Sequence, residues 1–306
     1  MAEPAPGGTA GVMPQAAALD SDSAPLAARR NRVARILMRP QAIIVGIALL
    51  GLLILAFLGP QLAPYNPIDP DPLNEFLPPS TAHLMGTDDL GRDVLSRIMA
   101  GTRYSLLAVV TVLSIGLVVG TIVGAVAGYV GGILDEMLMR ITDIFLAFPS
   151  IVLALALASA LGPSLTNAML AISVVWWPTY ARLVRGQVLS VKQNAYVEAA
   201  RALGVPLRSL LIRHVLRNSM TPVIVQLSLD MGNVLVTAAG LSFIGVGAQL
   251  PTPEWGLMVS TDAQNILNAW WQSTFPGLAI FLTAFVFNLA GDVLQDILTP
   301  NARMLA

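Results

Sequence analysis

Long apolar runs recur along this 306-residue sequence and constrain its fold more than any other feature. An α-helix needs about 20 residues to cross a hydrocarbon core of about 30 Å, and several of the runs reach that length. Hydrophobic residues make up 55% of the chain and charged residues 11%, whereas an average soluble domain is about 25% charged. The sequence therefore predicts an all-α polytopic membrane protein.

The composition excludes several classes of site. The net charge is −1, so no strong overall field attracts the chain to nucleic acid. The sequence has no cysteine, which rules out disulfides, iron–sulfur clusters and thiolate metal sites. Its two histidines, His83 and His214, fall on opposite sides of the predicted topology, and two lone histidines do not make a metal site. We therefore expect no metal or cofactor on this chain.

Six transmembrane helices are predicted, separated by polar residues, glycine and proline. They cover residues 41–63, 104–130, 141–161, 165–183, 221–246 and 271–294. Residues 1–40 are expected to form a disordered cytoplasmic tail with a basic end, and residues 64–103 a polar external segment. Residues 104–298 then form a five-helix core, followed by a cytoplasmic tail at residues 299–306.

The basic residues orient these spans. All but three of the 17 lysines and arginines fall in segments that this topology places in the cytoplasm. The exceptions are Arg92, Arg97 and Arg103. Such a bias is typical of the positive-inside rule, so both termini are expected in the cytoplasm. The longest internal loop, residues 187–219, is then cytoplasmic too.

The second predicted span carries glycines at regular spacing. Gly116, Gly120, Gly124 and Gly128 recur every four residues and form one bare stripe along a helix. Small residues let a neighbouring helix approach closely, which matters because lipid tails provide no hydrophobic drive for helix association. Glycine is also common in membrane helices generally, but four in register favour helix packing.

The cytoplasmic loop has the signals of two short helices joined by a bend. Residues 196–203 are good helix formers, and the negative charge of Glu198 suits the start of a helix. Gly204 ends that helix, and Pro206 opens another at Leu207. One interpretation is a basic amphipathic helix on anionic headgroups, and the other is an element that docks into a soluble partner. The specified bend favours docking.

The same loop resembles a known family. Glu198-Ala199-Ala200, followed after three residues by Gly204, is similar to the EAA loop of ABC-importer permeases, and residues 180–186 extend the match. The resemblance implies a coupling helix that sits in a groove of a cytoplasmic ATPase. The coupling residues it implies are Glu198, Ala199, Ala200, Arg201, Gly204, Pro206 and Leu207. Where the family usually has Leu-Pro, this chain has Leu216-Arg217, so the second helix is expected to run smoothly into the fifth span.

Other motifs resemble one subfamily. GTDDLGRDVLSRIMAGTRYSL (residues 86–106) is similar to the signature of the second, C-type permease of dipeptide, oligopeptide and nickel importers. LSFIGVGAQLPTPEWGLM (residues 241–258) and the stretch from Asp143 to Pro149 agree. The resemblance implies a type I ABC importer permease in a bacterial plasma membrane. Its implied partners are a sister permease, two ATPase domains and an extracytoplasmic substrate-binding protein.

The resulting hypothesis is a non-catalytic permease that forms half of a pathway for di- or oligopeptides. No G-x-x-x-x-G-K-[ST] motif occurs, so ATP and magnesium are expected on the partner ATPases. One alternative is a permease of this family for nickel or another small solute. Another is an ion-coupled secondary transporter, which would need inverted repeats and intramembrane carboxylates. A membrane-embedded enzyme is disfavoured because H-E-x-x-H and G-x-S-x-G are absent.

Polar residues in unusual places remain open to two interpretations. Asp230 and Asn233 fall inside the fifth span, where polar groups are costly, and either line a substrate pathway or bond a neighbouring helix. Arg140 and Asp143 are spaced to pair on one helix face. The external segment, with charged residues at positions 88, 89, 92 and 93, is either a docking face for a binding protein or a self-contained fold.

Overall fold

The computed structural model describes residues 36–298, and they are mostly helical. This range contains no strand, and one isolated bridge pairs Thr87 with Asp93. The all-α class is therefore confirmed for the described residues. Most of the predicted N-terminal tail, the predicted C-terminal tail and the basic residues at positions 29, 30, 32, 35 and 303 lie outside this range.

Most helices follow one another with short connections. The helices are α2 (Pro40–Leu62), α3 (Val94–Val130), α4 (Gly132–Leu146), α5 (Ser150–Leu161), α6 (Leu165–Val191), α7 (Ala195–Ala202), α8 (Leu207–Ser209), a π-helical segment (Leu210–Leu216), α9 (Arg217–Phe243), α10 (Trp255–Asp262) and α11 (Trp271–Leu298). The long exception among the connections is the segment between α2 and α3. Short 3₁₀ turns lie at Pro72–Asn74 and Ala263–Asn265.

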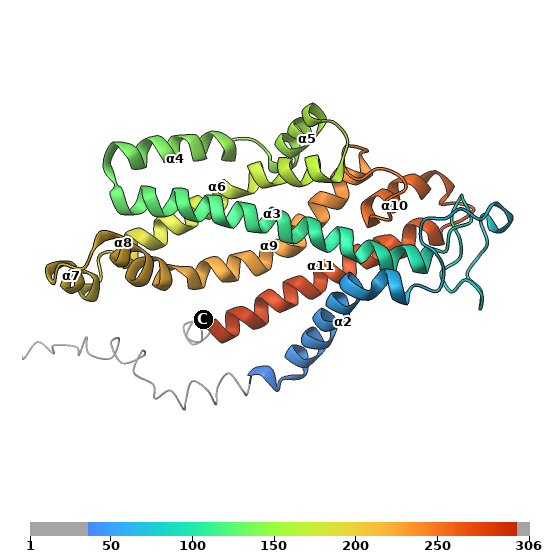
Figure 1. Cartoon of the computed structure of the whole chain (residues 1–306), viewed down its shortest axis with the longest axis horizontal. Helices are drawn as coiled ribbons and strands as arrows, with labels where there is room; N and C mark the ends of the chain where they lie inside the picture. Colours follow the sequence, from blue (N-terminus) through green and yellow to red (C-terminus); the bar gives the residue numbers. More distant parts are fainter. Residues whose placement is uncertain (1–35, 299–306) are drawn as a thin grey trace, which may run out of the picture.

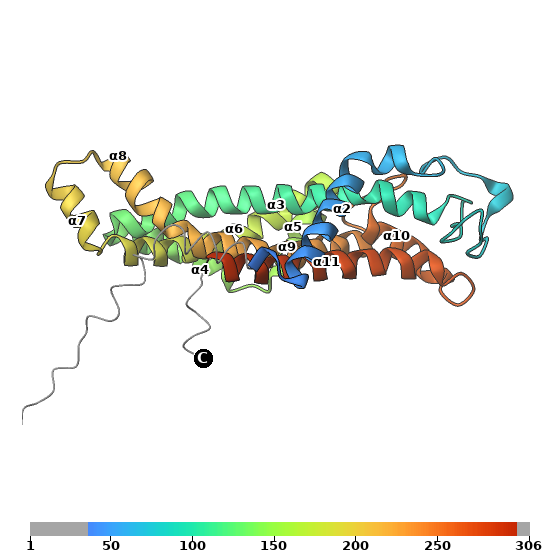
Figure 2. The same cartoon turned by 90° about the horizontal axis from the view of Figure 1, so that it is seen from below.

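The long helices form an elongated bundle (Figures 1 and 2). At one end, α7 and α8 project beyond the other helices. At the opposite end lie α10 and the segment between α2 and α3. The basic loop and the polar segment therefore lie at opposite ends of the bundle, as the charge distribution predicts.

The described residues do not confirm six spans. Four helical stretches are long and apolar enough to cross a membrane: Pro40–Leu62, Val94–Val130, Leu207–Phe243 and Trp271–Leu298. The predicted third span is a pair of helices, α4 and α5, bent by 87°, and it makes a fifth span if the pair is taken as one. The helix α6, predicted as the fourth span, does not qualify, and its sequence carries Pro178, Arg182 and Arg185.

Local chemistry explains where the boundaries differ from the prediction. The helix α3 begins at Val94 rather than at residue 104, because the Asp93 carboxylate caps it by accepting a hydrogen bond from the Ser96 amide. The bend between α4 and α5 lies at Pro149, which restricts the residue before it to extended backbone. From Leu207 to Phe243 the chain is one continuous helix, so the smooth exit expected from Arg217 is confirmed.

The glycine stripe of α3 lies against α6. A Cβ added to Gly120 would fall 2.5 Å from the Cβ of Tyr180, and one at Gly128 would fall 2.9 Å from the carbonyl oxygen of Arg185. A Cβ at Gly124 would collide with the carbonyl oxygen of Ala181, whereas Gly116 is looser, at 3.5 Å from Trp176. Contact this close requires glycine, and it makes α3 and α6 the central pair of the bundle.

Ion pairs attach α4 to α6. The Arg185 guanidinium donates two hydrogen bonds to the carboxylate of Asp135, and Arg182 bonds Asp143. The predicted Arg140–Asp143 pair is wrong, because Arg140 instead bonds Glu136, one turn earlier on the same helix. The partner of Asp143 is therefore on another helix, which spacing along one helix could not indicate.

Candidate coupling site

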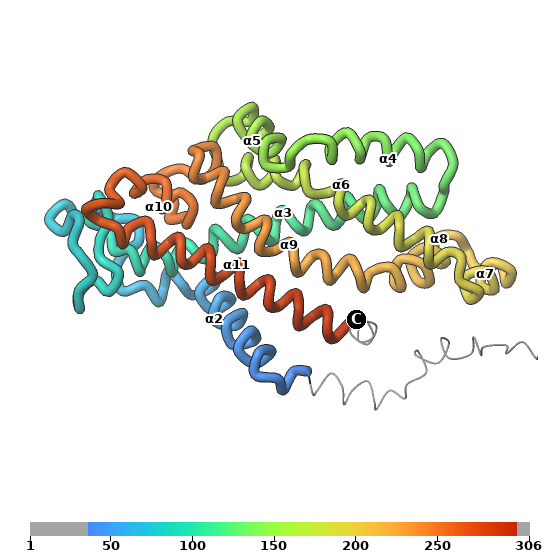
Figure 3. The backbone as a smooth tube through the Cα atoms, turned by 180° about the vertical axis from the view of Figure 1, so that it is seen from behind, coloured from blue at the N-terminus to red at the C-terminus, as the bar shows by residue number. Residues whose placement is uncertain are grey.

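The loop predicted to be cytoplasmic folds as a hairpin at the end of the bundle, formed by α7, a sharp bend and the helix that begins at α8 (Figures 1 and 3). We call residues 195–216 the coupling hairpin. It contains two helical arms joined by a bend, as the sequence predicted.

Gly204 and Pro206 determine the bend. Gly204 has φ +74°, in the left-handed region that glycine adopts without a steric penalty. Its amide donates to the carbonyl of Arg201 at 3.0 Å, and the Val205 amide donates to the carbonyl of Ala200 at 3.1 Å. This pair of bonds is the Schellman pattern that terminates helices. Pro206 then precedes the second arm, its carbonyl accepting from the Leu210 amide at 2.9 Å.

The hairpin has an anchored face and a free face. Val197, Ala200, Leu210 and Val215 are buried and belong to the main hydrophobic core. Of the coupling residues implied by the family resemblance, Ala200 is therefore an anchor. The other members are exposed and lie close together: Glu198, Ala199, Arg201, Gly204, Pro206 and Leu207.

Two large apolar side chains project at the tip of the hairpin. Leu203 is 84% exposed and Leu207 is 63% exposed, although leucine has an apolar side chain. Sequence reasoning missed Leu203. The feature that could have identified it is an apolar residue directly before the glycine that ends the helix. Exposed leucines beside a rigid bend are typical of a surface that a partner covers.

The charges on the free face are unpaired within the described residues. Neither Glu198 nor Arg201 forms an ion pair with any residue in the range 36–298. Glu198 lies in the first turn of α7, where its negative charge complements the helix dipole. Both side chains are thus available to a second chain.

A polar clamp ties the two arms of the hairpin together. The Asn218 side-chain amide donates to the Tyr196 hydroxyl at 2.7 Å and to the carbonyl of His214 at 2.8 Å. The Tyr196 hydroxyl donates in turn to that same carbonyl at 3.4 Å. Sequence reasoning missed this clamp, because its members are separated along the chain and match no motif.

The two pathway candidates lie in different environments. Asp230 is buried, and its carboxylate accepts hydrogen bonds from the Tyr180 hydroxyl at 2.9 Å and the Gln226 amide at 3.0 Å. It therefore makes the bond to a neighbouring helix that was one of its two interpretations. Asn233, one turn further along α9, is exposed on the surface of the bundle. The Asn233 side chain nevertheless hydrogen-bonds the Asp230 carboxylate, so the two residues adjoin one another on α9.

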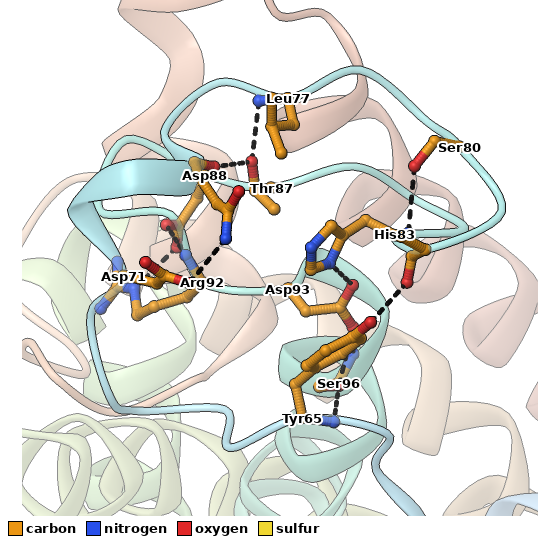
Figure 4. A network of polar contacts seen from close by, with 12 residues as sticks. Tyr65, Asp71, Leu77, Ser80, His83, Thr87, Asp88, Arg92, Asp93 and Ser96 are labelled. Atoms are coloured by element: carbon orange, nitrogen blue, oxygen red, sulfur yellow. Dashed lines mark hydrogen bonds and ion pairs between the residues drawn. The ribbon is translucent and has the colours of Figure 1, made fainter.

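The external segment folds against the bundle through buried polar contacts (Figure 4). The Asp88 carboxylate accepts from the Arg92 side chain at 2.8 Å and lies 3.4 Å from the Arg97 guanidinium. Asp93 bonds His83 at 3.0 Å as well as capping α3. These side chains are buried, so the self-contained fold is the interpretation that the structure favours for them.

The first residues of α11 hold the same segment. The indole nitrogen of Trp271 and the side-chain amide of Gln272 both donate to the carbonyl of Thr87, at 3.0 Å and 2.9 Å. Because both donors are buried, the contact joins the segment before α3 to the start of α11.

Two acids beside this segment have raised pKa values. Burial raises the pKa of Asp262 to about 7, and the nearby carboxylates of Asp88 and Asp89 add to the rise. Burial also raises the pKa of Glu254, although its carboxylate caps α10 by accepting from the Leu257 amide at 2.9 Å. Both acids lie outside the membrane-spanning helices, in the connection between α9 and α11.

Comparison with known proteins places this architecture in a family. Residues 116–304 match the family described as binding-protein-dependent transport system inner membrane component. The chain belongs to this family. The match spans the whole glycine stripe, the coupling hairpin and both pathway candidates.

Relatives of this permease are similar to it over most of their length. It is 47% identical to the probable D,D-dipeptide transport system permease protein DdpC of Escherichia coli (strain K12), over 86% of this chain and 88% of that protein. It is 43% identical to the glutathione transport system permease protein GsiD of Pectobacterium atrosepticum, over 88% and 90%. The permease is therefore a multi-pass membrane protein of the C-type identified from the sequence motifs.

Solved structures show the same fold. The permease aligns with a chain of the MetNI methionine ABC transporter, solved in inward-facing conformations, with a TM-score of 0.55. The alignment covers 66% of this chain and 96% of that chain at 19% identity. The ABC-importer permease fold is thereby confirmed.

Proposed function

We propose that this permease imports short peptides as one subunit of an ATP-driven transporter. The supporting observation is the close relation to permeases whose names specify a D,D-dipeptide and glutathione, which are both short peptides. The chain would form half of the translocation pathway, and a sister permease the other half. This substrate class is favoured over nickel because the relatives at 41–47% identity are named for dipeptides and glutathione.

The coupling hairpin is the proposed contact with the ATPase. Its exposed residues Glu198, Arg201 and Leu203 offer an acid, a base and an apolar tip to one partner groove. The bend at Gly204 holds these residues in a fixed arrangement, which a helix lying on the lipid headgroups would not require. ATP and magnesium bind to the ATPase partners in this proposal, and this chain performs no catalysis.

The buried face would transmit motion from the ATPases into the bundle. Val197 and Val215 are fully buried in the core, and the Tyr196–Asn218 contact joins α7 to the first turn of α9. The helix from Leu207 to Phe243 then continues without a break toward the external end. A push on the hairpin would tilt this helix as a rigid body, the kind of motion that alternates inward- and outward-open states.

The remaining partners follow from the topology proposed for the chain. With both termini in the cytoplasm of a bacterium, the coupling hairpin faces the ATPases and the segment between α2 and α3 faces outward. An extracytoplasmic binding protein would deliver the peptide at that external end. Asn233, exposed on α9, is the described residue that we assign to the pathway lining.

Reconstitution tests the proposal directly. The permease, its sister, the ATPases and the binding protein would be placed in liposomes, and uptake of labelled dipeptide, glutathione and nickel would be compared. We expect peptide uptake that requires ATP and the binding protein. Uptake by this chain alone on a proton or sodium gradient would overturn the proposal, and uptake of nickel without peptide would overturn its substrate class.

A further inference from the structure

A cavity of about 610 Å³ lies within the membrane-embedded part of the bundle, between α2, α3, α9 and α11. Its volume falls in the range of about 300–1,000 Å³ that is usual for small-molecule sites. Its walls include Leu53, Phe57, Leu106, Val110, Met231 and Phe287. Figure 3 shows α2 beside α11 on the outside of the bundle, so the cavity lies beneath a peripheral helix.

One lining residue is charged. Arg103, on α3, is exposed and makes no hydrogen bond or ion pair with the residues that the structure describes. The other two arginines on the external side, Arg92 and Arg97, are buried beside Asp88. Arg103 therefore leaves a positive charge without a protein counter-ion at the wall of an apolar cavity.

The level of Arg103 in the bundle is fixed by the contact between α2 and α3. Gly59 packs against the backbone of Met99, with no room for a side chain. Arg103 lies about one turn, or about 6 Å, further along α3 toward the cytoplasmic end. A long basic side chain at this depth extends its charged end to the headgroup region while its stem stays among apolar groups. Its guanidinium can thus reach a lipid phosphate.

We propose that this cavity binds an acyl chain of one outer-leaflet phospholipid, whose phosphate is held by Arg103. An acyl chain gains little by leaving the bilayer for a cavity lined with leucine, because lipid tails are equally apolar. Retention of one particular lipid therefore depends on the charged contact. Arginine suits it, since the guanidinium binds phosphate oxygens with two parallel hydrogen bonds.

The bound lipid would support α2. This helix is attached to the bundle near its two ends, through Gly59 against Met99 and through the ion pair between Arg39 and Asp296 at 3.3 Å. The cavity separates these two attachments, and the acyl chain fills it. The lipid is thus a structural ligand of the permease, whatever solute passes through the pathway.

Native mass spectrometry tests the site in the intact transporter. The complex would be released from nanodiscs of phosphatidylethanolamine and phosphatidylglycerol, and the retained phospholipids counted. We expect one tightly retained phospholipid per permease. Arg103→Gln lowers its retention about tenfold or more, as the loss of a charge-assisted contact implies, and Arg103→Lys keeps part of it.

A second variant separates the site from a folding defect. Ala56→Trp fills the cavity while leaving Arg103 in place, and we expect it to displace the lipid as well. Ile44→Trp is the matched control, because Ile44 is 64% exposed on the same helix but does not line the cavity. Arg140→Gln removes an exposed arginine elsewhere in the bundle and should leave the retained lipid unchanged.

Three results would overturn the proposal. The first is a retained phospholipid that persists in both Arg103→Gln and Ala56→Trp. The second is displacement of the lipid by inorganic phosphate, which would make Arg103 a site for free anions. The third is efficient disulfide formation between Leu53→Cys and a cysteine introduced on a helix of the sister permease, which would make the cavity a subunit interface.

Discussion

The side-chain amide of Asn218 donates a hydrogen bond of 2.7 Å to the hydroxyl of Tyr196, and the two residues lie on different helices, α9 and α7. This contact spans the coupling hairpin at its base. Val197 is buried in the main core, so α7 is held by this polar contact and by apolar packing, whereas the second arm continues directly into α9. In the proposed function, a force on the exposed tip would pass through these contacts to α9.

Removing the clamp should uncouple transport from ATP hydrolysis. Tyr196→Phe deletes the hydroxyl at a cost of about 1 kcal/mol in stability, so the protein still folds and assembles. We expect the amount of solute moved per ATP to fall about fivefold or more, because α7 can then move without α9. Tyr65→Phe is the control, since it deletes a comparable hydroxyl bond, to Ala82, at the external end. If the two variants move the same amount of solute per ATP, the clamp does not transmit force.

Substitution of Gly204 should impair ATPase stimulation through the coupling hairpin. The loss should be larger for residues that tolerate the left-handed backbone less well. No atom lies within 4 Å of a Cβ added there, so the cost is the left-handed backbone, about 1–2 kcal/mol for an ordinary residue. Asparagine tolerates this conformation and a β-branched residue does not. Gly204→Val should therefore reduce ATPase stimulation more than Gly204→Asn does. Gly186→Ala, also in open space but within the helix α6, is the neutral control. Identical losses for valine and asparagine would contradict this account.

Loss of the charge at position 198 should affect the partner and leave the fold intact. Glu198 is exposed and has no ion-pair partner among the described residues, so Glu198→Ala should change the stability by less than about 0.5 kcal/mol. Co-purification of the ATPase with the permease should nevertheless weaken. Glu75→Ala, an exposed acid at the external end, should leave co-purification unchanged. A melting temperature that falls in step with binding would instead assign Glu198 a structural role.

The features predictable from sequence are those encoded locally. The Gly204–Pro206 bend depends on the backbone preferences of those residues, and the glycine stripe depends on helical periodicity, so both are visible in the sequence. The failure of α6 to qualify as a span follows from its own composition, so the sequence could have shown it. What the sequence does not show is that Arg182 and Arg185 of α6 pair with carboxylates on α4, which lie far away along the chain. The clamp between Tyr196 and Asn218 likewise requires two arms to be brought together. Contacts of this kind depend on tertiary packing, which no short pattern specifies.

Filling the glycine stripe should destabilise the whole bundle. Gly124→Ala puts a methyl group against the carbonyl oxygen of Ala181 in the most tightly packed helix pair. Overpacking of this kind costs about 1–3 kcal/mol, so we expect a lower melting temperature in detergent. Gly51→Ala is the matched control, because nothing lies within 4 Å of its Cβ and alanine favours a helix. Equal melting temperatures for the two variants would show that α3 and α6 do not pack as described.

The external end should become less stable as the pH rises toward neutrality. Because burial raises the pKa of Asp262 from its ordinary value of 3.8 to about 7, the folded protein binds a proton there that the unfolded chain has already lost. Stability is then highest below the lower value and falls between the two, by up to about 1.4 kcal/mol per pH unit for one full proton. Asp262→Asn keeps the neutral form, so the variant should gain stability over the wild type as the pH is raised from 5 to 8.

Thermal unfolding of the wild type and Asp262→Asn at several pH values measures this difference. The charged groups around Asp262 are Asp88, Asp89, Arg92 and Arg97. Because both proteins contain these four groups, the difference between the two stabilities removes most of the pH dependence that the groups cause. Asp69→Asn changes an exposed carboxylate of the same external end and should track the wild type at every pH. A gap between wild type and Asp262→Asn that does not widen with pH would show that Asp262 is ionised in the folded protein throughout. The arginines beside it would then outweigh the effect of burial.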